Sequence, residues 1–441
     1  METSTAPRYR DIWRLTWPVI LANSATPLLG LVDTAVIGHT AGSQHLGGVA
    51  LGSLIFSFVY WGFGFLRMGT TGFVAQATGR RDEARIREVI LRGLAMASLI
   101  GVGLLLLQWP LRILSLSLFG ASNEVETITG DYFRIRIWGA PAVLASYVLL
   151  GYFIGRGMSG TLLLVQAVLN GLNMLLDIGF AGYLQWGARG IALGTALAEW
   201  ITLGLALLLV WRHQSQHTQW PGLDQLPWRG LLAWHKLLPV LRVNLDLMIR
   251  TLFLLLGFAV FTDQGARYGD ITLAANHILL QFISFCAFFL DGFAYTTEAL
   301  AGQALGQRDR PRFHQVLRRT TLLAAITALA LAAGILFLGP VLLAWLTDLP
   351  QVQSRAQEFL IWCGLYVTLS FVAFQLDGLF IGTTTTAPLR NASILATSGF
   401  LALVWGLGAL GNTGLWLAFV GFVVLRGLLL GLSIDGITRR L

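Results

Sequence analysis

Five polar residues lie inside segments that are otherwise apolar. Asp33 lies in PLLGLVDTAVIGH, and Asp177 ends the run NGLNMLLD. Asn170, Asn173 and Asp177 are spaced i, i+3 and i+7, so a helix would carry them on one face. Thr195 lies in the next apolar segment, GIALGTALAEW. Because an ionised carboxylate is costly in an apolar medium, this pattern indicates a water-filled site that serves transport.

The same residues are expected at one depth in a membrane. Asp33 and Asp177 come late in two outward-running helices, and Thr195 follows Gly187 by eight residues in an inward-running helix. At ~1.5 Å per residue, all three fall in the outer half of the bilayer. Carboxylates there can carry a proton, and hard oxygen donors can also bind Na⁺. We predict a coupling-ion site for H⁺ or Na⁺ at Asp33, Asn173, Asp177 and Thr195. The alternative is that Asp177 only stabilises a helix end beside Asn173.

The composition indicates that the elements carrying these residues cross a membrane. Of the 441 residues, 55 % are hydrophobic and 12 % are charged, and mean hydropathy is +0.69. A soluble domain carries about a quarter charged residues. No segment alternates as a barrel strand would, so helices must cross the ~30 Å hydrocarbon core. The apolar stretches predict twelve spanning helices, at 15–38, 46–77, 88–118, 125–155, 160–184, 187–211, 237–262, 271–305, 316–346, 352–382, 388–410 and 414–437.

An internal repeat divides the chain into two similar halves. Residues 69–89 match residues 296–316 at a shift of 227 positions, and residues 18–23 match residues 239–244 at a shift of 221. Such repeats are the usual construction of secondary transporters, whose substrate site lies between the halves. We predict an all-α membrane protein with two pseudo-symmetric six-helix lobes. The lobes are 1–211 and 237–441, joined by a cytoplasmic linker at 212–236.

The basic residues predict the orientation in the membrane. Arginines gather at 8–14, 80–92, 308–319 and 439–440, which the positive-inside rule places in the cytoplasm together with both termini. The net charge of +8 is spread over separate loops, which does not favour nucleic-acid binding. We expect a multi-pass protein of the cell's inner (plasma) membrane. Nothing in the spacing of cysteine or histidine indicates a metal site or an organic cofactor.

The second lobe carries three further acids in predicted spans. Asp246 and Arg250 are spaced i, i+4, which suits an intrahelical ion pair. Arg250 could instead pair with Asp291 or Asp377 of other spans. Structural pairing is the first interpretation, and the alternative is that one acid faces a cavity and binds a cationic substrate. Asp291 ranks first for that role because no basic residue lies at i±3 or i±4. The repeat places Leu254 opposite Asp33, so coupling is expected only in the first lobe.

The chain resembles the multidrug and toxic compound extrusion (MATE) transporters. The resemblance is carried by LVDTAVIGH, by an NxxxD pattern in the fifth span, by GARGIALGTA in the sixth and by the paired GRRDEARIREV-type loops. The phrases HLGGVALGS and FLDGFAYTTEALAGQALG resemble its DNA-damage-inducible (DinF) branch. The resemblance implies a V-shaped central cavity between the lobes and the same coupling-ion site. It also implies a bend of the first helix at Pro18, with Gly30 as a second hinge position.

The function expected from these features is antiport. The protein would export amphipathic or cationic organic compounds, such as drugs and toxins, in exchange for inward H⁺ or Na⁺. Aromatic rings can attract a cation by roughly 0.5–2 kcal/mol. We expect a monomer in the lipid bilayer that binds small organic substrates and needs no cofactor beyond the coupling ion. The candidate cavity residues are Asp246, Asp291, Asp377, Phe56, Trp61, Phe63, Phe285 and Phe289.

Three other classes of protein remain as alternatives. A flippase for a lipid-linked precursor would share the repeat but would need a strongly basic cavity, and the spans hold few arginines. A membrane-embedded enzyme would need a nucleophile–base or metal arrangement, and no HExxH or GxSxG motif occurs. A channel would not need titratable groups confined to one lobe.

Overall fold

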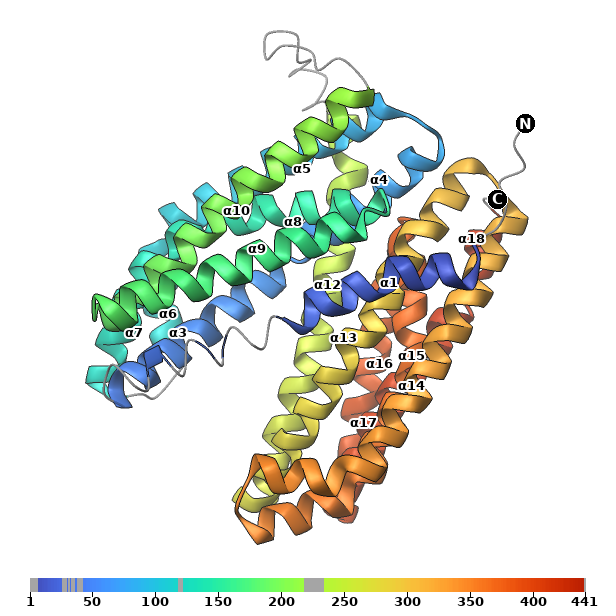
Figure 1. Cartoon of the computed structure of the whole chain (residues 1–441). Coiled ribbons are helices and arrows are strands. Elements are labelled where there is room, and N and C mark those ends of the chain that lie inside the picture. The colour runs from blue at the N-terminus through green and yellow to red at the C-terminus, as the bar shows by residue number, and fades with distance from the viewer. Residues whose placement is uncertain are drawn as a thin grey trace. The chain divides into compact units, whose positions relative to one another are not determined.

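The chain is helical throughout the part that the structure describes. The computed structural model describes residues 7–25, 30, 32, 36, 37, 43–117, 122–217 and 234–439 (Figure 1). Among these residues no strand occurs, and eleven helices are long and apolar enough to cross a membrane. They coincide with the second to twelfth predicted spans. The first predicted span, 15–38, lies mostly outside the described residues.

The helices of the first half follow one another with short connections. α3 and α4 form a single candidate span that is interrupted at Phe63 and Gly64. The elements are α1 (Tyr9–Ser24), α3 (Ser43–Gly62), α4 (Phe65–Gly79), α5 (Glu83–Leu106), α6 (Gln108–Ser117), α7 (Asn123–Arg136), the 3₁₀ turn η1 (Ile137–Gly139), α8 (Ala140–Gly155), α9 (Ser159–Asp177), the π-helical turn η2 (Ile178–Tyr183) and α10 (Gly187–His217).

The helices of the second half are longer and less interrupted. α13 continues through the position at which α3 and α4 are separated in the first half. The elements are α12 (Trp234–Arg267), α13 (Asp270–Gln307), α14 (Arg310–Leu346), α15 (Pro350–Gly382), α16 (Ala387–Gly406), the 3₁₀ turn η4 (Gly408–Leu410), α17 (Gly411–Gly431) and α18 (Asp435–Thr438).

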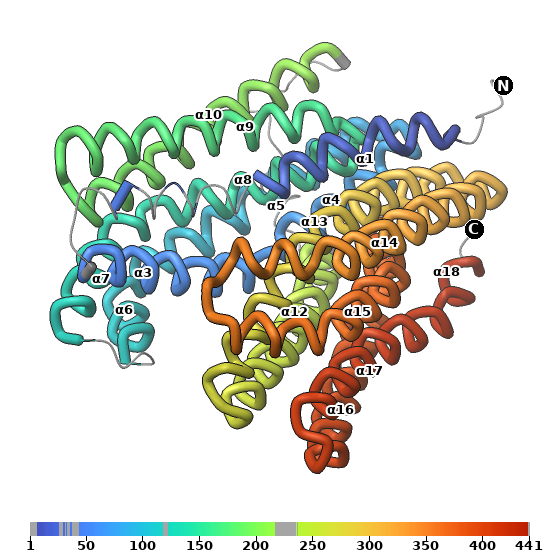
Figure 2. Tube along the Cα trace, turned by 60° about the horizontal axis from the view of Figure 1, so that its bottom comes forward, coloured from blue at the N-terminus to red at the C-terminus, as the bar shows by residue number. Residues whose placement is uncertain are grey.

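Two compact units contain these helices. One holds residues 21–77 and 81–240, in which α5 packs on α8, α9 on α10 and α3 on α7. The other holds the residues up to Ile20, Thr78–Arg80 and everything from Leu241, with α13 packed on α15 and α16 on α17. In Figure 2, α14 and α15 of this second unit run side by side. The predicted lobe boundaries stay a prediction, and most of the predicted linker lies outside the described residues.

Glycines bring equivalent helices into backbone contact in both units. A Cβ at Gly151 of α8 would lie 2.5 Å from the carbonyl oxygen of Arg67 on α4. A Cβ at Gly378 of α15 would lie 2.3 Å from the carbonyl oxygen of Ala294 on α13. Gly151 and Gly378 are 227 positions apart, as are Arg67 and Ala294. The sequence repeat is therefore a repeat of helix packing, which relies on small residues as membrane helices commonly do.

One turn further along, the same contact recurs. A Cβ at Gly155 would lie 2.8 Å from the carbonyl oxygen of Thr71, and one at Gly382 would lie 2.2 Å from that of Glu298. Both contacts advance by four residues on each helix, so the paired helices run parallel. Real Cβ atoms do not approach an oxygen this closely, and the spacing of these helix pairs therefore depends on glycine.

The loops between the spans repeat as well. Arg81 and Arg308 both adopt a left-handed backbone, with φ of 58° and 57°. The next residue in each case caps the following helix: the carboxylate of Asp82 accepts from the backbone N–H of Arg85, and that of Asp309 accepts from Arg312, both at 2.9 Å. These local requirements explain why the two loop sequences match at the 227-position shift.

The first part of α1 packs within the second unit. The hydroxyls of Thr16 and Thr296 are 2.8 Å apart, and the rings of Trp13 and Phe293 lie 6.0 Å apart between centroids. Gly292 permits this approach, since a Cβ there would lie 2.5 Å from Cγ1 of Ile20. A segment from the start of the sequence therefore completes the α13 face of the second unit.

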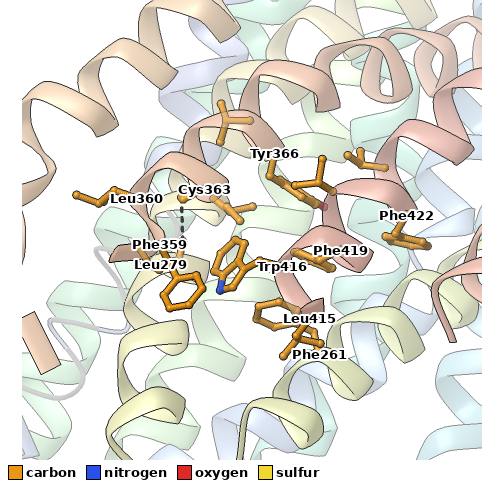
Figure 3. Close-up of a cluster of buried hydrophobic side chains, with 14 of the residues drawn as sticks. Phe261, Leu279, Phe359, Leu360, Cys363, Tyr366, Leu415, Trp416, Phe419 and Phe422 are labelled. Atoms are coloured by element: carbon orange, nitrogen blue, oxygen red, sulfur yellow. Dashed lines mark hydrogen bonds between the residues drawn. The ribbon is translucent and has the colours of Figure 1, made fainter. Parts of the chain in front are cut away.

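The second unit has an aromatic core, which Figure 3 shows in close-up. The rings of Tyr366 and Phe419 stack at 4.5 Å between centroids, and Phe261 lies 4.4 Å from Phe419. Trp416 is fully buried, and its indole N–H donates to Oδ1 of Asn276 at 2.9 Å. Because its one polar group is satisfied, Trp416 contributes its apolar surface without the cost of a buried unpaired donor.

We predict that Gly378→Ala lowers the stability of the protein by about 1–3 kcal/mol, because the new methyl group meets a backbone carbonyl that cannot move alone. The measurement is thermal unfolding in detergent, followed by tryptophan fluorescence. The matched control is Gly334→Ala in α14, where a Cβ would have no neighbouring atom within 4 Å. That control should keep or raise the melting temperature, since alanine favours a helix over glycine. Equal effects of the two substitutions would contradict the packing argument.

Candidate functional site

The polar face of α9 is buried inside the first unit. Asn170, Asn173 and Asp177 have relative exposures of 8 %, 2 % and 0 %. The amide nitrogen of Asn173 donates to the hydroxyl of Thr195 on α10 at 2.9 Å, and that hydroxyl donates to the carbonyl of Ile191 at 2.8 Å. The structure therefore brings Asn173 and Thr195 together, and it places Asp177 one turn further along the same face of α9.

Glycines on α10 make room for Asp177. A Cβ at Gly194 would lie 2.4 Å from Oδ1 of Asp177, and one at Gly190 would lie 2.8 Å from the backbone nitrogen of Ala181. The helix changes to a π-helical turn, Ile178–Tyr183, directly after Asp177. Such turns are uncommon and often occur at functional sites. In Figure 1, α9 and α10 lie next to each other where the chain passes from one to the other.

Three of the predicted residues are not placed at this site by the structure. Asp33 lies outside the described residues. Gly30 is exposed, and Pro18 is buried inside α1, two residues before the point at which α1 passes from one unit to the other. The hinge role of Pro18 and Gly30 and the coupling role of Asp33 stay predictions.

The second unit holds apolar residues at three of the four corresponding positions, and only Asn170 corresponds to a polar residue, Thr397. At the shift of 227 positions, Asn173, Asp177 and Thr195 correspond to Phe400, Val404 and Phe422. Phe400 and Phe422 are buried members of the aromatic core, in which Figure 3 labels Phe422. Val404 packs against that core. Leu254, the counterpart of Asp33, packs against it as well. The two units therefore use equivalent positions in opposite ways, one for a buried polar site and the other for a hydrophobic core.

The predicted intrahelical pair of Asp246 and Arg250 is wrong. Asp246 accepts from Nη1 of Arg390 at 2.7 Å and from the hydroxyl of Thr386 at 2.9 Å. Arg250 instead donates to Asp377, the second partner that the sequence had allowed. The spacing i, i+4 permits a pair but does not require it, and contacts with α15 and α16 replace the local one.

Asp377 is buried between two arginines. Its Oδ2 accepts from Nη2 of Arg250 and from Nη2 of Arg426. The residue is only 5 % exposed. Asp291 is half-buried on α13, and its predicted role in binding substrate stays a prediction.

The aromatic candidates occupy different environments. Phe56 is buried and lies 5.0 Å from Phe133 between centroids, so it serves the packing of the first unit. Trp61 and Phe285 are 60 % and 53 % exposed. Phe63 and Phe289 are half-buried, and Phe289 packs edge-on against Phe285 at 5.4 Å between centroids. Their role in lining a cavity stays a prediction.

The sequence analysis missed a buried ion pair in the first unit. Nη1 of Arg136 donates to Oε2 of Glu199 at 2.6 Å, and Nη2 donates to Oε1. The guanidinium lies 5.3 Å from the ring centroids of both Phe56 and Tyr60. A signal was present, because an arginine and a glutamate fall inside the predicted spans 125–155 and 187–211. In the same way, Arg390 and Arg426 fall inside the last two predicted spans.

Comparison with known proteins gives the family. The family model MatE matches residues 18–178 and again residues 247–405, one match in each half of the repeat. The chain belongs to the MatE family. Members of this family are membrane transporters and not enzymes, and this chain is therefore a membrane transporter. The resemblance to MATE transporters that the sequence analysis noted is confirmed.

Full-length relatives agree with this assignment. The DNA damage-inducible protein F of Escherichia coli strain K12 is 38 % identical over 431 residues, covering 98 % of this chain and 92 % of the relative. This similarity confirms the predicted likeness to the DinF branch. A probable multidrug resistance protein NorM of Agrobacterium fabrum is 28 % identical over 428 residues, covering 91 % of this chain and 88 % of the relative.

Solved structures confirm the fold. The outward-facing conformation of a multidrug resistance MATE family transporter of the MOP superfamily matches with a TM-score of 0.88 and 20 % identity, covering 99 % of this chain and 97 % of that chain. A MOP superfamily transporter from Pyrococcus furiosus matches with the same TM-score and 21 % identity, over the same shares of the two chains. The twelve-helix transporter fold predicted from the sequence is therefore correct.

We predict that Asn173→Ala and Thr195→Ala have non-additive effects on thermal stability, because each removes the same hydrogen bond. The double variant should cost less than the sum of the single changes by roughly 0.5–1.5 kcal/mol. The control cycle pairs Asn173→Ala with Thr202→Ala, which is also buried on α10 but about 10 Å further along the helix. Additive losses in the first cycle would show that the two side chains do not form one site.

Proposed function

We propose that this transporter exports amphipathic organic compounds across the cell's inner membrane in exchange for inward H⁺ or Na⁺. The observation that carries the proposal is the buried polar face of α9, with Asp177 fully buried beside the hydrogen-bonded pair Asn173 and Thr195. The relatives named as multidrug resistance proteins support an organic substrate. We also propose that both termini lie in the cytoplasm.

The cost of the site argues for a role beyond packing. A carboxylate with 0 % exposure in an apolar bundle is expensive, and an apolar side chain would fill the same volume at lower cost. The second unit has apolar side chains, valine and phenylalanine, at the equivalent positions, and these are buried at a lower free-energy cost. An ion that binds and leaves again gives the first unit a reason to keep its polar residues.

Coupling requires that the ion changes the affinity for substrate. A bound ion can shift a conformational equilibrium only through different affinities for the two states. Asp33 and Asp177 would bind the ion, and the first helix would respond at Pro18 and Gly30. Residues of α1 up to Ile20 belong to one unit and those from Leu21 belong to the other. A conformational change in α1 near Pro18 would therefore act on both units.

We predict that Asp177→Asn and Asp33→Asn each abolish ion-driven efflux while the protein still folds and inserts. The asparagines keep the shape of the side chain and remove the titratable charge. The measurement is substrate efflux from proteoliposomes, with a pH gradient and a Na⁺ gradient imposed separately. The gradient that drives the wild-type protein identifies the coupling ion. Export by either variant at the wild-type rate would remove that aspartate from the coupling mechanism.

A steric variant tests the same site without removing its chemistry. Gly194→Ala places a methyl group at a position 2.4 Å from Oδ1 of Asp177, so we expect at least a tenfold loss of ion-driven efflux. Gly204→Ala on the same helix is the matched control, because nothing lies within 4 Å of a Cβ there. If both variants transport alike, the close approach of α10 to Asp177 has no importance for coupling.

A further inference from the structure

The second unit holds a buried cluster of unequal charges. Arg250 on α12, Asp377 on α15 and Arg426 on α17 have side-chain exposures of 10 %, 7 % and 8 %. One carboxylate oxygen, Oδ2 of Asp377, accepts from both guanidinium groups. Three helices that are far apart in the sequence thus direct one negative and two positive groups to the same place.

The cluster carries one uncompensated positive charge. Arginine does not lose its proton in proteins, so both guanidinium groups are charged. In the part of the chain that the structure describes, Nε of Arg250, Nε of Arg426 and Oδ1 of Asp377 have no hydrogen-bond partner. The arginines therefore keep donors as well as charge for a further partner.

The nearest acid on the same helix does not supply this partner. Asp246 lies one turn before Arg250, but its two oxygens accept from Arg390 and Thr386. If Asp246 and Arg390 are added to the group, three arginines face two aspartates and the excess is still one positive charge. Arg390 is 35 % exposed, so this group reaches the surface of the unit.

We propose that this cluster binds the carboxylate or sulfonate of an amphipathic organic monoanion, which is a substrate of the transporter. A buried net charge in a low-dielectric surrounding is costly, and an anion that accepts from the free Nε–H groups would remove that cost. This inference rests on the export of organic compounds proposed above.

The single excess charge selects among ligands. A cation would meet like charge here, so Asp246 and Asp377 do not provide the counter-charge for cationic substrates that the sequence analysis gave as the alternative to structural pairing. A lipid-linked pyrophosphate carries at least two negative charges, which exceeds what the cluster can neutralise. Two arginines and one aspartate leave one excess positive charge, which a single carboxylate or sulfonate neutralises.

The test uses three fluorescent probes that differ in one terminal group: pyrenebutyrate, pyrenebutanol and pyrenebutylammonium. Binding to the purified full-length protein in detergent is measured by fluorescence titration. We expect the wild-type protein to prefer the anion over the neutral probe, and the neutral probe over the cation. A preference for the cation, or no difference among the three, would overturn the proposal.

Charge-changing variants test whether the cluster causes the preference. Arg426→Gln makes it neutral and should weaken pyrenebutyrate roughly tenfold, with pyrenebutanol unchanged. Asp377→Asn raises the excess to two and should not weaken the anion. The double variant Arg426→Gln/Asp377→Asn restores an excess of one and should recover much of the affinity for the anion. A loss shared by all three probes, or no recovery in the double variant, would show that these residues act only through folding.

Two controls complete the design. Arg267→Gln removes the same charge from an exposed arginine about 25 Å further along α12, and it should leave all three affinities unchanged. Varying the chloride concentration of the buffer separates an organic anion from a bound chloride ion. If pyrenebutyrate and chloride do not compete and only chloride depends on Arg426, the site holds an inorganic ion and the proposal is wrong.

Binding in detergent does not depend on coupling. If the probes bind as expected but no gradient drives efflux, the proposed antiport fails and the anion site stands. If a gradient drives efflux of organic compounds and the Arg426→Gln variant binds pyrenebutyrate as the wild type does, the antiport stands and the anion site fails.

Discussion

A charge inside a bundle of apolar helices must find a partner within the bundle, and this constraint decides where the helices of each unit can meet. In the first unit Arg136 of α7 meets Glu199 of α10 through two hydrogen bonds. In the second unit Asp377 of α15 joins α12 to α17 through Arg250 and Arg426. Breaking one partner would leave the other charge buried alone, which costs about 3–5 kcal/mol. Such pairs add specificity of packing to helices whose surfaces are otherwise alike.

The duplication supplied a common scaffold, and the charges then made the units different. The scaffold is visible in the glycine contacts, which are the same for Gly151 and Gly378. On that scaffold the first unit holds Asn173 and Asp177 where the second holds Phe400 and Val404. The aromatic core of the second unit therefore occupies the region that the first unit keeps polar. If the polar site binds the coupling ion as we propose, this arrangement confines ion binding to one of the two units.

Much of the fold could be predicted from the sequence because hydrophobic length and repeat are both local signals. Eleven described spans lie where the apolar stretches predicted them. The spacing of Asn170, Asn173 and Asp177 predicted one helical face, and all three are buried on α9. The proximity of Thr195 followed from its depth in the membrane. These inferences need only the rise and period of a helix.

Partner choice between helices could not be predicted in the same way. Asp246 had Arg250 at i+4, yet it binds Arg390 of α16, whose position depends on how α16 packs. Nothing in the spacing of Arg136 and Glu199 indicates that α7 and α10 meet. The packing of Thr16 against Thr296, 280 positions away, depends on where the first helix lies rather than on its own composition. Long-range pairing is set by tertiary packing, which leaves only a weak trace in a single sequence.

The last spanning helix of each unit shows how small a change produced the asymmetry. Glu199 of α10 and Arg426 of α17 occupy equivalent positions, 227 residues apart, and carry opposite charges. In the first unit a single arginine neutralises the acid. In the second unit the corresponding arginine joins Arg250 around one aspartate and leaves an excess of positive charge. Salt and water screen such a charge poorly when it is buried, so its effect on a nearby ligand is larger than that of the many exposed arginines. The sign of one side chain at a repeated position thus separates a unit with a balanced pair from a unit that attracts anions.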